Sequence, residues 1–354
     1  MAKTTSAGAA ALATTARPEP DATCVAHDAV TGVASSAPGT SVGLTSAALA
    51  PVPACSGDPV TAAPILRPPI GPTIRRHRLG AELKRLREAR SLRLEDVAPS
   101  LGVAPSTLSR IENGKAPART SYVRILLGLY RVDDPEHRRL LADLAREGQR
   151  KGWWAGYEDL LPAGAAEYLG LEAAASQVCE FAVQAVPGLL QTADYAAAAW
   201  RASQPGTSAD QLARLAEFTL RRQQFAREGG TGLHVVIDEA ALIRPVGSIQ
   251  IMAGQMDHLA AAARSVTVQV VALTEPLPRL SLPFTVLRFA DPADADAAYM
   301  SNASGHVEIT MREAEVRALR RTFAALSKAA MSAEESASLF RCLAVRHARQ
   351  LVKA

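Results

Sequence analysis

The chain is poor in cysteine and in long apolar runs. Only 4 of its 354 residues are cysteine, and no two of them form a Cys-x-x-Cys pair. Such widely spaced thiols argue against a disulfide scaffold and against a zinc cluster. No apolar run approaches the length of a membrane span, and the N-terminal stretch lacks the dense apolar segment of a secretory signal. We therefore expect no contact with a membrane.

Aromatic residues make up only 5% of the chain and are absent from residues 1–72. Ala, Thr, Ser, Pro and Gly dominate that stretch, and no apolar period is sustained through it. A segment of this composition cannot bury enough surface to offset the entropy of the chain. We expect either a disordered, low-complexity tail over residues 1–72 or a start site assigned too far upstream.

Positive charge is concentrated in one region. The whole chain has a formal net charge of +4, yet residues 73–151 contain 18 Lys and Arg against 10 Asp and Glu. The rest of the chain is therefore slightly acidic. A single surface arginine usually does no more than face solvent, but a segregated basic excess favours a polyanionic partner such as nucleic acid.

Residues 92–114, within the basic region, read as two short helices joined by a tight turn. Gly102 suits the turn because it has no Cβ, and Pro105 suits the first turn of the second helix because its missing N–H has no helical partner. The apolar positions at helical spacing are Leu94, Val97, Ala98, Leu108 and Ile111. The pattern predicts a helix-turn-helix, although turn and spacing alone also fit a plain helical hairpin.

The remaining positions of the second helix are short hydroxyls and one long donor, the side-chain types that bind base edges. We predict that the base-reading residues are Ser106, Thr107, Ser109 and Arg110. Basic residues at the start of the preceding helix and just after the second helix are placed to meet the DNA backbone. The predicted phosphate contacts are Arg75, Arg76, Arg78, Lys115 and Arg119.

Residues 106–114 resemble the second helix of the XRE (lambda-repressor-like) family, which ends in Ile/Leu-Ser-Arg/Lys-Ile-Glu-Asn-Gly. This resemblance implies an all-α, lambda-repressor-like DNA-binding domain. Two positions depart from the family pattern, both in the first helix of the pair. Arg93 stands where the family has a capping Ser or Thr, and Pro99 lies inside the helix. We expect that helix to be kinked or to end early.

Flanking patterns complete a five-helix domain over residues 73–150. Apolar spacing predicts a first helix over residues 75–89. Thr120 or Ser121 is positioned to cap a fourth helix, and Asp133-Asp134-Pro135 begins a fifth. A domain of about eighty residues can bury a core of its own.

Residues 151–354 mix strand and helix patterns, which predicts an α+β (mixed) C-terminal domain. Strands are expected at 233–237, 266–271, 284–289, 298–300 and 306–310. Helices are expected at 192–203, 208–227, 248–263, 311–328 and 332–346.

Two groups of residues in this domain are candidates for binding a ligand or partner. Trp153 and Trp154 follow the fifth helix, where a pair of large rings serves either as a stacking surface or as core between domains. Asp238, Glu239 and Arg244 form a charged set beside a strand end, which suits either a site or a salt-bridged helix start. The histidines of this domain lack ligand spacing, so we expect no metal and no cofactor.

Several strings of the second domain resemble the uncharacterised C-terminal domain of actinobacterial regulators of the WhiJ type. The strings are 153–154, 168–172, 186–195, 238–242, 244–247 and 289–292. In that family the regulators stand beside small partner proteins in antitoxin-like or developmental gene pairs. The resemblance implies that residues 151–354 bind a partner protein or a signal.

Together these observations predict a sequence-specific transcriptional regulator that binds double-stranded DNA as a homodimer, with its two reading helices about 34 Å apart. Its expected place is the cytoplasm, at the nucleoid, and its further partner is a small protein from a neighbouring gene. The alternative is a DNA-targeted small-molecule receptor or enzyme. No nucleophile, base and orienting group can be assembled from the sequence, so we do not expect an enzyme.

Overall fold

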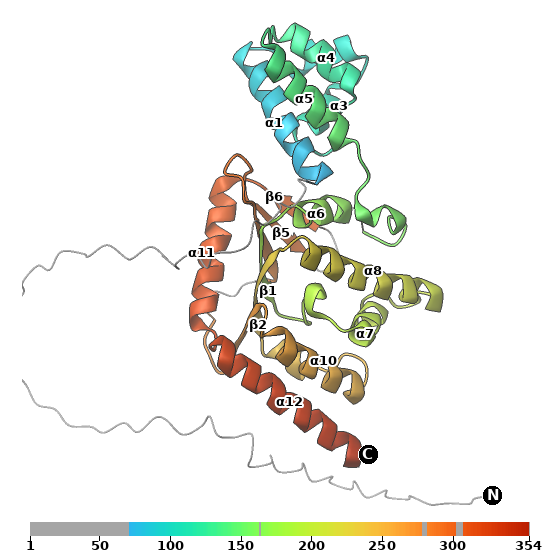
Figure 1. Ribbon diagram of the computed structural model, residues 1–354, viewed down its shortest axis with the longest axis vertical. Helices are drawn as coiled ribbons and strands as arrows, with labels where there is room; N and C mark the ends of the chain where they lie inside the picture. The colour runs from blue at the N-terminus through green and yellow to red at the C-terminus, as the bar shows by residue number, and fades with distance from the viewer. Residues whose placement is uncertain (1–70, 163, 278–281, 302–306, 354) are drawn as a thin grey trace, which may run out of the picture. The chain divides into compact units, whose positions relative to one another are not determined.

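The computed structural model describes residues 71–162, 164–277, 282–301 and 307–353 (Figure 1). The predicted N-terminal tail lies outside the described residues, apart from its last two positions. Within the described ranges, no helix is long and apolar enough to span a membrane.

The first part of the described chain is helical, as predicted. Its elements are α1 (Pro72–Ala89), α2 (Leu94–Val97), the 3₁₀ turn η1 (Ala98–Leu101), α3 (Pro105–Glu112), α4 (Thr120–Leu129) and α5 (Pro135–Gly148). Helix α1 begins three residues before the predicted position, with Pro72 in its first turn. The helix-turn-helix consists of α2, η1 and α3.

Helix α2 ends early, as its sequence predicts. The α-helical hydrogen bonding stops at Val97, and the chain continues through Pro99 as a 3₁₀ turn. Arg93 supplies no side-chain cap, but the Asp96 carboxylate accepts the Arg93 backbone N–H at 2.8 Å. The start of the helix is therefore stabilised from inside its own first turn.

The starts of the last two helices of this part differ. Asp134 caps α5, because its Oδ1 accepts the Glu136 backbone N–H at 3.0 Å. The predicted cap of α4 by Thr120 or Ser121 is wrong, since Thr120 is already helical and Arg119 occupies the N-cap position. Arg119 makes no side-chain cap hydrogen bond there.

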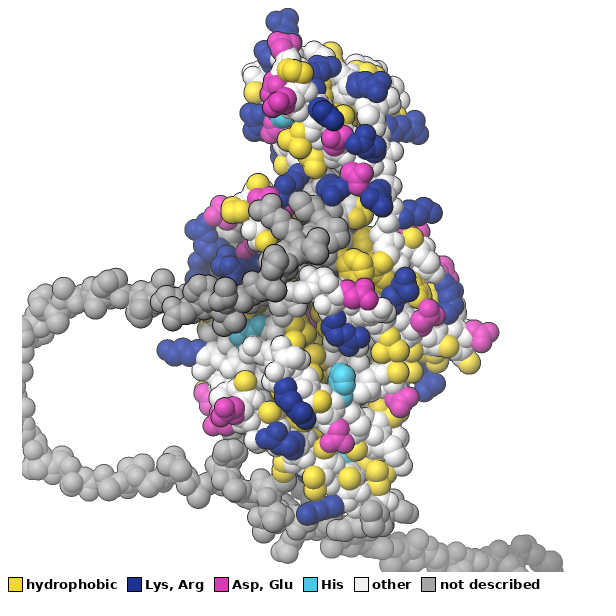
Figure 2. Space-filling model, in the orientation of Figure 1, with side chains coloured by type: hydrophobic (Ala, Val, Ile, Leu, Met, Phe, Trp, Pro, Cys, Tyr) yellow, Lys and Arg dark blue, Asp and Glu magenta, His cyan; other side chains and the backbone are white. Residues whose placement is uncertain are grey.

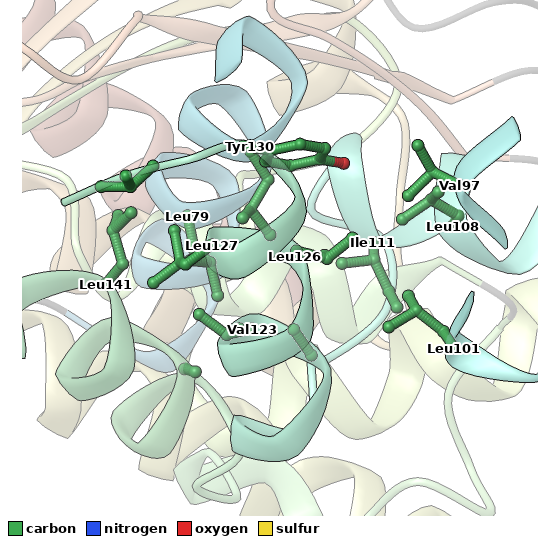
Figure 3. Close-up of a cluster of buried hydrophobic side chains, with 14 of the residues drawn as sticks. Leu79, Val97, Leu101, Leu108, Ile111, Val123, Leu126, Leu127, Tyr130 and Leu141 are labelled. Atoms are coloured by element: carbon green, nitrogen blue, oxygen red, sulfur yellow. The ribbon is translucent and has the colours of Figure 1, made fainter. Parts of the chain in front are cut away.

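The first, helical part of the described chain has its own hydrophobic core (Figure 3). Leu108 and Ile111 of α3 are buried, and they pack in one cluster with Val97 of α2 and Leu126 of α4. Leu79 of α1 belongs to the same cluster. The predicted inward positions of α3 are thus core residues, which leaves its other face to solvent.

The second part of the described chain is an α+β domain. Its helical elements are η2 (Trp153–Gly156), α6 (Ala165–Glu172), η3 (Gly188–Leu190), α7 (Ala193–Ser203), α8 (Ala209–Glu228), α9 (Ala240–Ile243), α10 (Ile249–Ala262), α11 (Glu313–Ala329) and α12 (Ala333–Lys353). Its strands are β1 (Gln177–Ala182), β2 (Gly232–Asp238), β3 (Thr267–Val271), β4 (Phe284–Arg288), β5 (Ala297–Ser301) and β6 (Val307–Thr310). Five of these strands are predicted from the sequence, but β1 is not.

The strands form one mixed sheet in the order β3-β2-β1-β4-β5-β6. The β1, β2 and β3 strands are parallel, whereas β4, β5 and β6 are each antiparallel to their neighbours. This arrangement confirms the mixed α+β prediction. The strand missed by the sequence pattern, β1, lies in the middle of the sheet.

Helices cover both faces of this sheet (Figure 1). Side chains of α6 and α8 pack on one face over β1, β4 and β5, and side chains of α7, α10 and α12 pack on the same face over β2 and β3. Helix α11 covers the opposite face. A sheet covered on both faces explains why β1 has no polar side to mark it in the sequence.

A charged pair is buried beneath α6 and α8. Arg222 of α8 donates two hydrogen bonds to the Glu172 carboxylate of α6, Nε to Oε1 at 2.7 Å and Nη2 to Oε2 at 2.5 Å. The side chains of Arg222 and Glu172 are 16% and 5% exposed. The Tyr168 hydroxyl donates to Glu172 Oε2 at 2.7 Å. The pair is well matched in geometry, as a buried ion pair must be.

Glu180 of β1 lies near this pair but is not bonded to it. Its Oε2 atom is buried and has no hydrogen-bond partner. Burial raises the pKa of Glu180 from its usual 4.5 to about 7, since the charged form loses its water. The nearby Arg222 opposes this increase, and the Glu172 carboxylate adds to it.

The raised pKa predicts that Glu180 makes folding less favourable as the pH rises. A carboxyl with a raised folded-state pKa contributes its stability fully below the unfolded pKa and loses it as the pH passes the folded value. Between pH 5 and pH 8 the free energy of unfolding of wild type should fall by about 2–3 kcal/mol relative to Glu180→Gln. Urea unfolding at both pH values measures this difference. An equal pH dependence in the two proteins would contradict it, and Glu158→Gln on the surface is the matched control.

Candidate DNA-binding site

Helix α3 has one buried and one open face. Leu108 and Ile111 face the core, whereas Ser106 and Arg110 are exposed and lie one turn apart. Thr107 and Ser109 are half-buried at the edges of the open face. The structure therefore brings the four predicted base-reading residues together on the accessible side of one short helix.

The Arg110 guanidinium makes no ion pair within the described residues. Arginine is the side chain that most often recognises a base, through two hydrogen bonds to guanine in the major groove. Asn113 is also exposed, but its Nδ2 donates to the Ser109 carbonyl at 2.8 Å and to the Ser109 hydroxyl at 3.3 Å. Asn113 thus holds the Ser109 hydroxyl in place, while Arg110 extends into solvent.

Gly114 ends this helix in the left-handed region, with φ at 69°. A Cβ at this position would also lie 2.6 Å from the His77 Nδ1 atom of α1. Both observations explain why only glycine fits here. The turn brings the Lys115 backbone N–H to the Arg110 carbonyl at 2.8 Å, and the Lys115 side chain is exposed.

Helix α1 holds the C-terminal end of α3 by a close backbone contact. A Cβ at Gly80 would lie 2.5 Å from the carbonyl oxygens of both Ile111 and Glu112. The two helices therefore approach more closely than any other residue at position 80 permits.

A buried ion pair also joins α1 to α3. Arg87 donates to the Glu112 carboxylate from Nε at 2.8 Å and from Nη2 at 2.9 Å. The two side chains are 9% and 2% exposed. The Arg87 Nη1 atom donates to the Leu92 carbonyl at 2.7 Å, so the same guanidinium also fixes the segment before α2. The orientation of α3 is set by these contacts rather than by α2 alone.

The predicted phosphate-binding residues fall into two groups. Lys115 and Arg119 are exposed directly after α3, and the Arg119 guanidinium lies 5.5 Å from the centre of the Tyr122 ring. Both remain available for a phosphate.

The structure argues against phosphate contacts by the other three residues, Arg75, Arg76 and Arg78. Arg75 pairs with Glu147 at 2.8 Å, and Arg78 binds the carboxylates of Asp291 and Asp294. Arg76 donates to the Thr73 hydroxyl at 2.9 Å, and its burial lowers its pKa. Their charges are already neutralised or removed from solvent, which the charge count of the sequence does not reveal.

On the face shown in Figure 2, basic side chains are spread over the first, helical part of the chain rather than gathered in an unbroken patch. On the face shown, Lys and Arg (dark blue) stand among Asp and Glu (magenta). This face therefore offers no uniform positive surface to a polyanion.

Trp153 and Trp154 occupy core positions. The Trp153 ring stacks on Phe218 and Phe225 of α8, with ring centres 5.5 and 5.9 Å apart. Trp154 is 5% exposed and belongs to a cluster with Ile74 of α1. Both rings are packed as core, which favours the predicted role as core between domains over the role as a stacking surface for a ligand.

Asp238, Glu239 and Arg244 do not converge on a site. Asp238 accepts the Ala240 backbone N–H at 2.9 Å, and Glu239 accepts the Leu273 backbone N–H at 2.9 Å. Arg244 is exposed, and within the described ranges no ion pair joins the three. The carboxylates bind backbone amides, so neither a charged site nor a salt-bridged helix start is formed here. The described residues also contain no group of three His, Cys, Asp or Glu placed to hold a metal ion.

Sequence reasoning missed the residues that hold the charged pairs. Glu112 is part of the motif, but its partner Arg87 is 25 residues away. Glu172 and Arg222 are 50 residues apart. A glutamate inside an otherwise apolar strand is a signal that could have identified Glu180, once β1 was recognised as a strand.

Two protein families match separate parts of the chain. A helix-turn-helix domain matches residues 78–140, and a domain of unknown function (DUF5753) matches residues 165–341. No curated protein and no solved structure matches the chain. The first match covers the helices that build and support the exposed face of α3.

Proposed function

Because the chain belongs to the family of the domain of unknown function DUF5753 and carries a helix-turn-helix domain before it, we propose that it is a sequence-specific transcriptional regulator of the XRE type. The observation that carries this proposal is the open face of α3. A short helix presents hydroxyls and an arginine that has no ion pair with any described residue, while two buried contacts with α1 fix its direction. This is the arrangement with which a helix enters the major groove.

The first test separates base reading from backbone contact. Arg110→Ala should cost about 1–3 kcal/mol on the specific DNA site and relax the preference at one base position. Lys115→Ala should instead weaken binding to all sequences alike and lower the salt slope by about one. Fluorescence anisotropy with specific and scrambled duplexes at several salt concentrations measures both. An equal loss on both duplexes for Arg110→Ala would contradict base reading by this residue.

The regulator acts as a homodimer in this proposal. Helix α4 exposes Ile125 and Leu129, one turn apart and 42% and 44% exposed, and α5 exposes Leu140 at 57%. Apolar side chains of this size on a DNA-binding domain suit contact with a second copy. A dimer would present two α3 helices about one turn of DNA apart, near 34 Å, to a pseudo-palindromic site.

The dimer proposal predicts that Ile125→Glu/Leu129→Glu sediments as a monomer and binds the specific site more weakly. Analytical ultracentrifugation measures the first effect and DNA titration the second. Leu220→Glu, on α8, alters a side chain of the same 42% exposure and should leave both unchanged. A double variant that remains dimeric would place the interface elsewhere.

We further propose an antitoxin-like role, in which the second domain binds a small partner protein encoded by a neighbouring gene. Its support is the resemblance of several strings in this domain to regulators found in such gene pairs. Co-expression with the neighbouring product should yield a stable complex that co-purifies with the chain, and separate elution of the two proteins would contradict it. Because the chain acts on DNA, its place would be the cytoplasm, at the nucleoid.

A further inference from the structure

The sheet face beneath α6 and α8 contains a cavity of about 230 Å³ that no residue of the DNA-reading surface contributes to. Its lining combines charged groups with aromatic rings: Tyr168, Glu180, Arg222, Phe284, Thr285 and Tyr299. The volume is below the usual range for drug-sized ligands, so any occupant is small.

The charges around the cavity do not balance. Arg222 is bound by two hydrogen bonds to Glu172, so the two form a neutral pair. Glu180 is left over, with its buried Oε2 atom lacking a hydrogen-bond partner. A buried carboxylate oxygen without a donor is unfavourable, and native proteins avoid it unless the group has a further use.

The position of Glu180 is fixed by the central strands. In the sheet register it stands between Val235 of β2 and Thr285 of β4, and Thr285 in turn stands beside Tyr299 of β5. The Tyr299 and Tyr168 ring centres are 4.1 Å apart. A carboxylate and two aromatic rings are therefore held together by three neighbouring strands and by α6.

We propose that this cavity binds a small organic cation, whose primary ammonium group donates hydrogen bonds to Glu180 and whose carbon atoms lie against the Tyr168 and Tyr299 rings. A cation supplies the donors that Oε2 lacks and neutralises the excess negative charge of the cluster. Aromatic rings attract cations as well as apolar groups. An anionic ligand would instead meet two carboxylates, because Arg222, the only guanidinium among the described residues that line the cavity, is bound to Glu172.

The site goes beyond the proposed DNA-binding function and stands without it. It lies in the domain of unknown function, where it would serve as the receptor for an effector. The test contains no DNA, so its failure leaves the proposal for α3 untouched.

Isothermal titration calorimetry of the full chain tests the site with two named probes, n-butylammonium and 2-phenylethylammonium chloride. Wild type should bind them at millimolar concentrations or below, and n-butanol, 2-phenylethanol and 3-phenylpropionate about tenfold more weakly or not at all. Absence of ammonium binding, or equal binding of the neutral alcohols, would overturn the proposal.

Variants assign the binding to Glu180. Glu180→Gln should lose about tenfold or more in affinity for the ammonium probes, whereas Glu158→Gln, an exposed change of equal charge, should bind as wild type. Unchanged affinity in Glu180→Gln would overturn the assignment. Glu180→Gln is expected to fold, because it removes an unsatisfied charge from the interior.

A further readout uses wild type alone. Part of the Glu180 population is protonated near pH 7, since its pKa is raised to about 7. An ammonium ligand favours the charged form, so binding should release protons into the buffer, and the heat should depend on the ionisation enthalpy of that buffer. Among the described residues, the titratable and charged groups around Glu180 are Arg222, Glu172, Tyr168 and Tyr299. Burial raises the pKa of the Tyr168 hydroxyl well above its usual value. A heat independent of the buffer would contradict ligation by Glu180.

Discussion

Replacement of Glu112 by alanine should open the helix-turn-helix. The substitution removes the buried carboxylate that binds the Arg87 guanidinium, 9% exposed, and leaves the more distant Glu88 at 3.6 Å, which is 56% exposed. Breaking a buried pair in this way costs about 3–5 kcal/mol. That is a large fraction of the stability of a domain of this size. The amides of α1 and α3 should exchange with deuterium about 10² to 10⁴ times faster, as measured by mass spectrometry of peptides from these helices.

A matched control for this prediction lies in the same part of the chain. Asp143 pairs with Arg146 on the surface of α5, where both side chains are well exposed, 44% and 68%. Asp143→Ala should change the exchange rates only slightly, because exposed pairs contribute little. Protection in Glu112→Ala equal to that in wild type would show that the Arg87 pair does not hold α3 in place.

Replacement of Arg222 by leucine should have an equally large effect in the second domain. Among the described residues it leaves the 5% exposed Glu172 carboxylate without a cation, and it also removes the positive charge that lowers the pKa of Glu180. We expect a loss of about 3–5 kcal/mol at pH 8, measured by urea unfolding. The loss should be smaller at pH 5, where the carboxylates of Glu172 and Glu180, which no longer have Arg222 beside them, can take up protons.

Arg214→Leu is the control for this prediction, because it lies on the same helix. Arg214 pairs with Asp159 at 2.7 Å, but the two side chains are 42% and 59% exposed. Its loss should cost less than about 1 kcal/mol. Equal destabilisation by both substitutions would contradict the distinct role of the buried pair.

The helix-turn-helix could be predicted because its signals are local. Apolar residues at i, i+3 and i+4 and a proline in the first turn of α3 act within a few residues of one another, and the structure places Leu108 and Ile111 in the core as expected. The early end of α2 follows from Pro99 in the same way. The predicted cap of α4 is wrong because the N-cap residue, Arg119, lies one position before Thr120. A sequence pattern alone does not resolve a helix start to a single position.

What could not be predicted depends on distant parts of the chain. Strand β1 is buried on both faces, so the alternation expected of a half-exposed strand is absent. Arg78 looks like a phosphate ligand in its own segment, but its carboxylate partner Asp291 is 213 residues away. The cavity at Glu180 could not be predicted for the same reason, because the residues that line it are far apart in the sequence and meet only once the sheet has formed.

The central claim, that α3 reads a DNA sequence, is tested most directly by selection of bound duplexes from a random pool by the full chain. Wild type should enrich one motif made of two symmetric half-sites about one helical turn apart. Thr107→Ala/Arg110→Ala, which alters only the open face of α3, should keep its deuterium protection but lose that enrichment. Absence of any enriched motif with wild type, or recovery of the same motif by the double variant, would contradict the claim.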